Sequence, residues 1–204
     1  MIKISNLNKA FNSRQLYKGL DMTIEDGDFV IFKGPSGCGK TTLLNMIGGI
    51  EDVDSGSVVI NGYDTSKKRD RQKILSEEVG FLFQNFALVE EKTVKQNLSF
   101  VKKKYRQNIE MKDALSFVGL SEDVLNKKVY TLSGGEQQRV AIARLIMKKC
   151  NIILADEPTG SLDRKNADMV FDLLNGLNEK GKTIVLVTHD SQLFGRGKLE
   201  YEIQ

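Results

Sequence analysis

A glycine-rich loop with one lysine and one threonine is the segment whose residue types could most clearly do chemistry. Residues 34–41 satisfy the phosphate-loop pattern G-x-x-x-x-G-K-[ST], between an apolar run ending at Phe32 and a helical stretch from Thr42 to Ile47. In such a loop backbone N–H groups turn towards phosphate oxygens, and the positive end of the following helix favours negative charge. The alternative is a glycine-rich turn with a chance lysine. The residues expected to contact the phosphates are Gly34, Pro35, Ser36, Gly37, Cys38, Gly39, Lys40, Thr41 and Thr42.

Within this loop, Lys40 is expected to bridge the β- and γ-phosphates, and the Thr41 hydroxyl is expected to bind Mg²⁺. Two carboxylates, Asp156 and Glu157, follow the apolar run from Ile152 to Ala155. They should lie at the carboxyl edge of a buried strand, where open α/β sheets bind ligands. Asp156 suits the task of holding Mg²⁺, and Glu157 suits activation of the attacking water. An acidic pair that merely caps a loop before a proline is the alternative.

A second anion site is indicated by residues 132–139, which read Leu-Ser-Gly-Gly-Glu-Gln-Gln-Arg. Ser133 and Glu136 have the S-x-x-E spacing of a capping box, so a helix begins here with free N–H groups. A plain capped helix explains these two residues. It leaves Gly134 and Gly135 unexplained, because glycines weaken a helix start unless something must approach closely.

Together these motifs resemble the ATP-binding subunit of an ABC transporter, with residues 132–137 as the family signature, over nearly the whole chain. The resemblance implies ATP and Mg²⁺ as cofactors and a head-to-tail dimer of identical or different subunits. It also implies that Ser133, Gly134, Gly135 and Glu136, with Asp163 of a D-loop, act in trans on the nucleotide held by the partner's Lys40.

Three further positions match the family pattern. Gln84 resembles the glutamine that senses Mg²⁺ and touches the permease, although it could be an ordinary exposed amide. His189, the only histidine, resembles the switch histidine that contacts the γ-phosphate and orients Glu157, so Lys40, Glu157 and His189 form the expected catalytic set. Phe11 stands where the family places an aromatic ring that stacks on adenine, with a core role as its alternative. Asp163 can equally be the N-cap of a helix starting near Arg164.

The apolar runs that hold these motifs predict an α/β fold. Four near-continuous apolar runs are typical of parallel strands covered on both faces: residues 29–32, 79–83, 152–155 and 183–187. Residues 2–24 and 57–62 alternate apolar and polar side chains and predict a small antiparallel sheet. Residues 86–148 predict a helical subdomain, in which Thr93 and Gln96 have capping-box spacing. The sequence therefore predicts one P-loop nucleotide-binding domain over 1–204.

The amino-acid composition indicates the cellular compartment and the kinds of partner to expect. Two cysteines among 204 residues favour a reducing compartment, and no leader or membrane-spanning run is expected. A net charge of +3 gives little reason to invoke nucleic acid, and the clusters at 67–69 and 102–104 are read as solvated faces. We therefore expect a peripheral protein at the cytoplasmic face of the membrane, bound through its permease.

Within the family, the segment 93–98 and the string 132–140 look most similar to the macrolide-export and lipoprotein-release group. That similarity implies a permease that exports or extracts peptides, lipids or lipoproteins. The open alternatives are a soluble ABC ATPase without a permease, such as the iron–sulfur assembly type, and a non-hydrolysing scaffold. The family usually continues further after His189, so we expect residues 198–204 to supply a shortened last strand. The short tail is expected either to weaken dimer contacts or to leave the subunit dependent on its permease for stability.

Overall fold

Five parallel strands form the central sheet of the computed structural model, which describes residues 1–203. They lie in the order β6-β7-β8-β3-β9, and every neighbouring pair is parallel. The expected parallel sheet is therefore confirmed, including the short last strand, although Gln204 lies outside the described residues. The strand bounds are β3 Phe29–Lys33, β6 Val79–Leu82, β7 Ile152–Asp156, β8 Thr183–Thr188 and β9 Leu199–Glu202.

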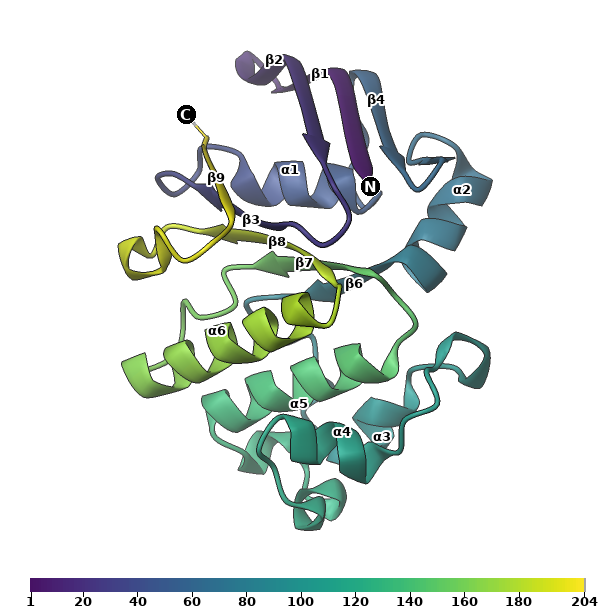
Figure 1. The fold of residues 1–204 in the computed structure, drawn as a ribbon, viewed down its shortest axis with the longest axis vertical. Coiled ribbons are helices and arrows are strands. Elements are labelled where there is room, and N and C mark those ends of the chain that lie inside the picture. Colours follow the sequence, from purple (N-terminus) through teal and green to yellow (C-terminus); the bar gives the residue numbers. More distant parts are fainter. Residues whose placement is uncertain (204) are drawn as a thin grey trace.

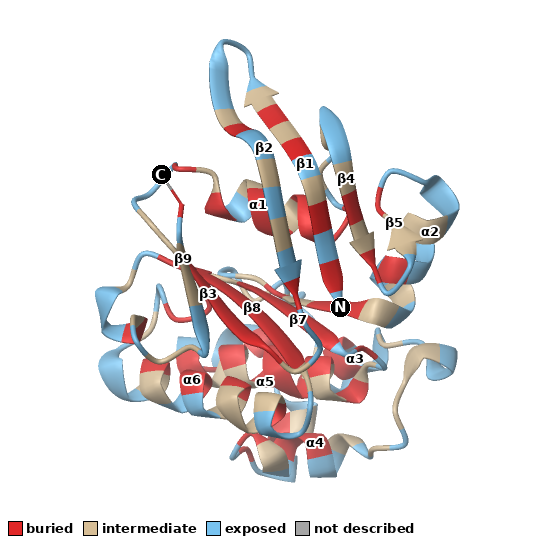
Figure 2. Ribbon diagram, turned by 45° about the horizontal axis from the view of Figure 1, so that its top comes forward, coloured by how far each residue is buried: buried red, intermediate tan, exposed pale blue. Residues whose placement is uncertain are grey.

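Alternate residues of these strands enter two different cores, which explains why the runs are apolar throughout. In β3, Phe29 and Ile31 pack with α5 (Gly134–Met147) and α6 (Arg164–Glu179), whereas Val30 and Phe32 pack with α1 (Lys40–Ile47) and the second sheet. Figure 1 shows this layering, with α1 on one side of the central sheet and α5 and α6 on the other. In Figure 2 the strands β3, β7 and β8 are accordingly coloured as buried along most of their length.

The second sheet is antiparallel and lies above α1 in Figure 1. Its strands follow the order β2-β1-β4-β5, and all three pairings are antiparallel. The alternating pattern predicted this sheet correctly, because one face packs on the core and the other meets solvent. Its strands are β1 Ile2–Phe11, β2 Arg14–Ile24, β4 Ser55–Ile60 and β5 Tyr63–Asp64.

Helices occupy the connections between the strands of the central sheet. None of those within residues 1–203 is long and apolar enough to span a bilayer. The α-helices are α1 Lys40–Ile47, α2 Lys68–Lys73, α3 Val94–Ser99, α4 Met111–Phe117, α5 Gly134–Met147 and α6 Arg164–Glu179. A π-helical turn, Ile74–Glu78, continues α2, and short 3-10 turns lie at Lys103–Tyr105, Glu122–Asn126, Val129–Thr131 and Ser191–Leu193.

Several element boundaries differ from the sequence expectation, and strands β3, β7 and β8 each extend one residue further than expected. Helix α1 begins at Lys40 rather than at Thr42, because Gly39 takes a left-handed conformation with φ 109° and ends the loop just before the lysine. Strand β6 ends at Leu82, one residue earlier than expected. The predicted capping box of Thr93 and Gln96 is confirmed at the start of α3.

Parallel pairing puts the carboxyl ends of the strands at one edge of the central sheet. The chain leaves β3 there into the glycine-rich loop, leaves β6 towards Gln84, leaves β7 into Glu157 and leaves β8 into His189. Segments that are distant in sequence therefore meet at this edge.

Candidate active site

The first turn of α1 is an open anion site. Gly39 provides no side chain to cap the helix, and the first turn carries no acidic residue. Backbone N–H groups at this helix end are therefore free to meet a negatively charged ligand. The predicted phosphate loop has the local structure that binding a phosphate requires.

Lys40 lies beneath this loop with its side chain almost fully buried. Its Nζ donates to the carbonyl oxygens of Gly34, at 2.8 Å, and Pro35, at 2.9 Å. An ammonium group has three N–H donors, so these bonds fix the side chain while leaving capacity for a ligand. Arg14, which the sequence analysis did not single out, also braces the loop by donating to the Gly37 carbonyl at 2.9 Å.

Cys38 contributes to this loop through its backbone and through its Sγ, which lies 3.9 Å from Lys40 Nζ. Its thiol is buried in the core cluster that lies below the loop. The expected contact of Cys38 with phosphate therefore rests on its N–H group.

Thr41 and Asp156 form an oxygen pair beside the loop. Thr41 Oγ1 donates to Asp156 Oδ1 at 2.8 Å. Burial raises the pKa of the Asp156 carboxyl, with a smaller contribution in the same direction from the charge of Glu157, while the Thr41 hydrogen bond lowers it. A partly buried carboxylate next to a hydroxyl suits Mg²⁺, which prefers oxygen ligands and favours the ionised acid. The predicted metal-binding pair is thus close enough to act together, and the donors fit this ion.

Glu157 and His189 are hydrogen-bonded to each other at the ends of neighbouring strands. His189 Nδ1 lies 2.8 Å from Glu157 Oε1, while Glu157 Oε2 accepts from the Thr188 hydroxyl at 3.1 Å and from the His189 N–H at 3.3 Å. Glu157 also has a left-handed backbone, with φ 44°. Such a conformation costs a non-glycine residue about 1–2 kcal/mol, so the surrounding structure must hold it.

Glu157 and His189 line, with Lys40 and Thr41, one cavity of about 520 Å³ beside the phosphate loop. Its lining also includes Phe11, whose ring is 46% exposed, with Lys9 Nζ 4.8 Å from the ring centroid. The alternative of a core role for Phe11 is therefore wrong. The lining consists of Phe11, Arg14, Leu16, Ser36, Gly37, Gly39, Lys40, Thr41, Thr42, Gln84, Glu157 and His189.

Gln84 lies between this cavity and a second one. It lines the phosphate-loop cavity together with Glu157, and it lines an adjoining cavity of about 630 Å³ together with Asp156 and Ser161. The residue expected to sense the metal thus lines one cavity with Glu157 and another with Asp156.

The signature residues do not line the phosphate-loop cavity of their own chain. Ser133 caps α5 as predicted, and Glu136 completes the capping box with Oε2 accepting from the Ser133 N–H at 2.8 Å. This bond is the main reason that the pKa of the Glu136 carboxyl lies below its usual value. The turn is a well-formed helix start outside the lining of the cavity that contains the chain's own loop lysine.

The two signature glycines differ in what surrounds them. A Cβ atom on Gly135 would lie 2.6 Å from Asn166 Cγ, so packing within the chain already excludes a side chain there. A Cβ on Gly134 would meet nothing closer than 3.8 Å. The absence of a side chain at Gly134 therefore has no explanation inside the chain, whereas close approach of an external group would explain it.

Asp163 caps α6, so the N-cap interpretation is confirmed. Its side chain accepts from the Asn166 N–H at 3.0 Å, and this bond is the first cause of the lowered pKa of Asp163. Asn166 Oδ1 in turn accepts from Arg139 on α5 at 3.2 Å. The starts of α5 and α6 are therefore joined, a link that the sequence analysis missed because nothing in the local pattern marks Asn166.

One protein family and several known proteins are similar to this chain in sequence. Residues 17–160 match the family profile described as ABC transporter. Over its full length the chain is 39% identical to the macrolide export ATP-binding/permease protein MacB of Campylobacter jejuni, but it spans only 33% of that protein. It is 39% identical to the lipoprotein-releasing system ATP-binding protein LolD of Bacteroides thetaiotaomicron, covering 95% of this chain and 92% of the relative.

A solved structure shows the same fold. The dimeric ATP-binding cassette MJ0796, in a post-hydrolysis state bound to ADP and Pi, superposes with a TM-score of 0.85 at 35% identity, covering 100% of this chain and 94% of that one.

Proposed function

The chain belongs to the ABC transporter family, and on that premise we propose that it is the ATP-hydrolysing subunit that powers a separate membrane permease. The observation that carries this proposal is the hydrogen-bonded pair of Glu157 and His189, which faces the phosphate loop across one cavity. A non-hydrolysing scaffold would have no use for this arrangement of an acid, a histidine and a loop lysine.

In the proposed reaction the loop N–H groups and Lys40 hold the β- and γ-phosphates. Mg²⁺ bound by Thr41 and Asp156 would neutralise charge that develops on the phosphates. Glu157 orients the attacking water in line with the γ-phosphate, and the hydrogen bond from His189 keeps the carboxylate aimed at it. Phe11 is proposed to stack on the adenine, and Gln84 to contact the metal site.

We also propose that two cassettes pair head to tail, so that Ser133, Gly134, Gly135 and Glu136 of one subunit, with Asp163, close over the nucleotide of the other. The space above Gly134 supports this, since it leaves room for close approach of an external phosphate. Whether the pair consists of identical chains depends on the native assembly. Each subunit then completes the active site of its partner.

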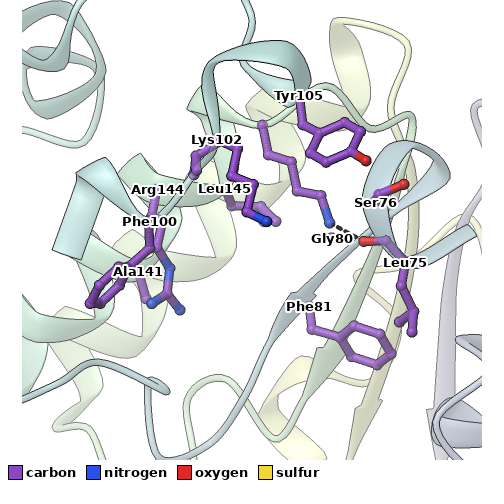
Figure 3. A pocket seen from close by; sticks show the side chains of 12 residues that line it. Leu75, Ser76, Gly80, Phe81, Phe100, Lys102, Tyr105, Ala141, Arg144 and Leu145 are labelled. Carbon is purple, nitrogen blue, oxygen red and sulfur yellow. Dashed lines mark hydrogen bonds between the residues drawn. The ribbon is translucent and has the colours of Figure 1, made fainter. Parts of the chain in front are cut away.

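A groove between α5 and the π-helical turn is the surface we propose for the permease. It has a volume of about 400 Å³, and Figure 3 shows Phe100, Leu75 and Phe81 lining it beside Lys102 and Arg144. Arg144 donates to the carbonyls of Ala87, at 2.7 Å, and Phe86, at 3.3 Å, in the loop that follows Gln84. The groove is thus joined to the cavity that holds the catalytic groups.

The charges of this groove favour an apolar helix with acidic side chains as the occupant. Burial lowers the pKa of both Arg144 and Lys148, and neither forms a salt bridge with a carboxylate within residues 1–203. Lys148 is instead held by the carbonyls of Leu75 and Val79. Half-buried cations without a counter-ion favour an acidic partner.

The proposed setting is one nucleotide-binding domain, with a helical subdomain at about residues 86–148, held at the cytoplasmic face of the membrane by the permease. The relatives named for macrolide export and lipoprotein release favour a permease that moves or extracts a peptide, lipid or lipoprotein. The permease would select the cargo. No role with nucleic acid is proposed.

The test is to tag Glu157→Gln, express it in its native cell, solubilise the membranes in Mg-ATP and identify the proteins that co-purify. A polytopic membrane protein is the expected result. A soluble scaffold, such as an iron–sulfur assembly complex, would contradict the permease proposal. The groove is tested by adding Lys102→Glu, which should reduce the co-purified permease. Lys103→Glu, which alters a neighbour outside the groove lining, is the matched control and should leave the yield unchanged.

A further inference from the structure

A buried glutamine joins the signature helix to the turn that carries Glu157. The side chain of Gln138 on α5 is 0% exposed, and its Nε2 donates to the Pro158 carbonyl at 2.6 Å. Its Oε1 has no hydrogen-bond partner within the described residues, and the same holds for the buried hydroxyl of Thr159, the residue next to the acceptor. Two buried polar groups, Gln138 Oε1 and the Thr159 hydroxyl, therefore lie beside this hydrogen bond without partners of their own.

Stability alone does not explain a glutamine at this position. The hydrogen bond to the Pro158 carbonyl contributes about 0.5–1.5 kcal/mol, which is no more than the cost of about 1–3 kcal/mol for the unpaired Oε1. Gln138 lies on the face of α5 that also buries Ala141, Ile142 and Leu145, where an apolar residue is the ordinary choice. The amide is therefore expected to serve something other than packing.

The turn that Gln138 reaches has to be held from outside. Glu157 has the left-handed φ of 44°, and its N–H donates to the Val187 carbonyl of β8 at 3.0 Å. The Gly160 N–H closes the turn by donating to the Glu157 carbonyl at 3.1 Å. Strand β8 thus fixes the start of the turn through the Glu157 N–H, and Gln138 holds the Pro158 carbonyl.

We propose that Gln138 is a positioning residue for Glu157, which links the signature turn of a subunit to the water-activating carboxylate of the same subunit. Ser133, Gly134 and Gly135 begin the helix that carries Gln138, so a ligand seated on them moves or holds the same turn of α5. The Arg139 to Asn166 bond ties this turn to the far end of the loop at Asp163. The inference rests on the proposed ATP hydrolysis in a head-to-tail dimer.

The main variant is Gln138→Met, which keeps the length of the side chain and removes the donor. We expect its kcat for ATP hydrolysis to fall by about 10- to 100-fold, because small misplacements of a catalytic group have effects of that size. The ATP dissociation constant should stay within about twofold, and the melting temperature should change little, because removal of the unpaired Oε1 offsets the loss of the donor to the Pro158 carbonyl. A residue that only stabilised the fold would not lower kcat while keeping the melting temperature.

Gln107→Met is the matched control. Gln107 also donates its side-chain N–H to a backbone carbonyl, that of Lys148 at 3.0 Å, but it contacts no part of the turn at Glu157. The control should leave kcat and KM unchanged. Equal losses in the two variants would overturn the inference.

A second measurement places Gln138→Met in the Glu157→Gln background. If Gln138 acts through Glu157, the second change should cause no further loss of the residual rate, whereas independent effects would multiply. Multiplying losses, or a kcat unchanged by Gln138→Met in a wild-type background that hydrolyses ATP, would overturn the inference and leave the proposed function standing. Absence of hydrolysis by the wild type would instead overturn the proposed function.

If Gln138→Met does not purify as a folded protein, Gln138→Asn takes its place. It keeps the amide but shortens the side chain by one methylene, so the donor no longer reaches the Pro158 carbonyl. The same loss of kcat with retained ATP affinity is expected, and a normal kcat would overturn the inference.

Discussion

Gly135→Ala should destabilise the protein, although alanine is normally the better helix residue. Without a clash, Gly to Ala in a helix gains about 1 kcal/mol. Here the new Cβ would lie 2.6 Å from Asn166 Cγ and 3.1 Å from its Nδ2, whereas carbon atoms pack at about 3.5–4.0 Å. Asn166 has little freedom to move away, because it bonds to Asp163 and accepts from Arg139. Overpacking of this kind costs about 1–3 kcal/mol, so after the gain in helix propensity we expect a net loss of up to about 2 kcal/mol.

The assay is urea unfolding of the nucleotide-free protein, with Gly134→Ala as the matched control. Its Cβ would meet nothing within 3.8 Å, so its stability should stay level or rise by up to about 1 kcal/mol. In an Asn166→Ala background the clash disappears, and Gly135→Ala should then stabilise the protein. If Gly135→Ala has the stability of the wild type, and Asn166→Ala does not change its effect, then Asn166 does not set the need for glycine at this position.

Three other changes test the site. Lys40→Ala should weaken ATP binding at least about tenfold by calorimetry, because the loop loses the cation that faces the phosphates. Asp156→Asn should abolish Mg²⁺-dependent hydrolysis and raise the melting temperature of the nucleotide-free protein. Burial raises the pKa of this carboxyl, so its ionised form opposes folding at neutral pH. A lower melting temperature would refute this. The lowered pKa of Glu136 adds stability above its usual value of 4.5 that is lost as the pH falls through the folded pKa. Glu136→Gln, which removes the titrating carboxyl, should therefore flatten the acid limb of the stability curve. An unchanged acid limb in this variant would count against Glu136 as the cause.

The parallel sheet and its carboxyl edge could be predicted because the strands are buried on both faces and their sequences are therefore apolar throughout. The local motifs were also predictable, since a phosphate loop and a capping box each have fixed spacing. Ser133 with Glu136 and Thr93 with Gln96 illustrate this, because a local hydrogen bond requires only local sequence.

Contacts between distant segments were not predictable from one sequence. The bonds of Gln138 to Pro158 and of Arg139 to Asn166 join residues 20 and 27 positions apart, and no local spacing encodes them. A polar residue on the apolar face of α5 was the one signal for Gln138. The exposed position of Phe11 was left open for a similar reason, because an aromatic residue near a strand end fits a core or a surface equally well.

The central claim is that the Glu157 side chain activates water at a nucleotide held by the phosphate loop. The most direct measurement compares phosphate release by the purified wild type and Glu157→Gln in Mg-ATP, together with ATP affinity and dimer content by light scattering. The account predicts hydrolysis by the wild type and, for the variant, retained ATP binding, a rate lower by at least about 100-fold and an accumulated ATP-bound dimer. Equal rates for the two proteins would contradict it.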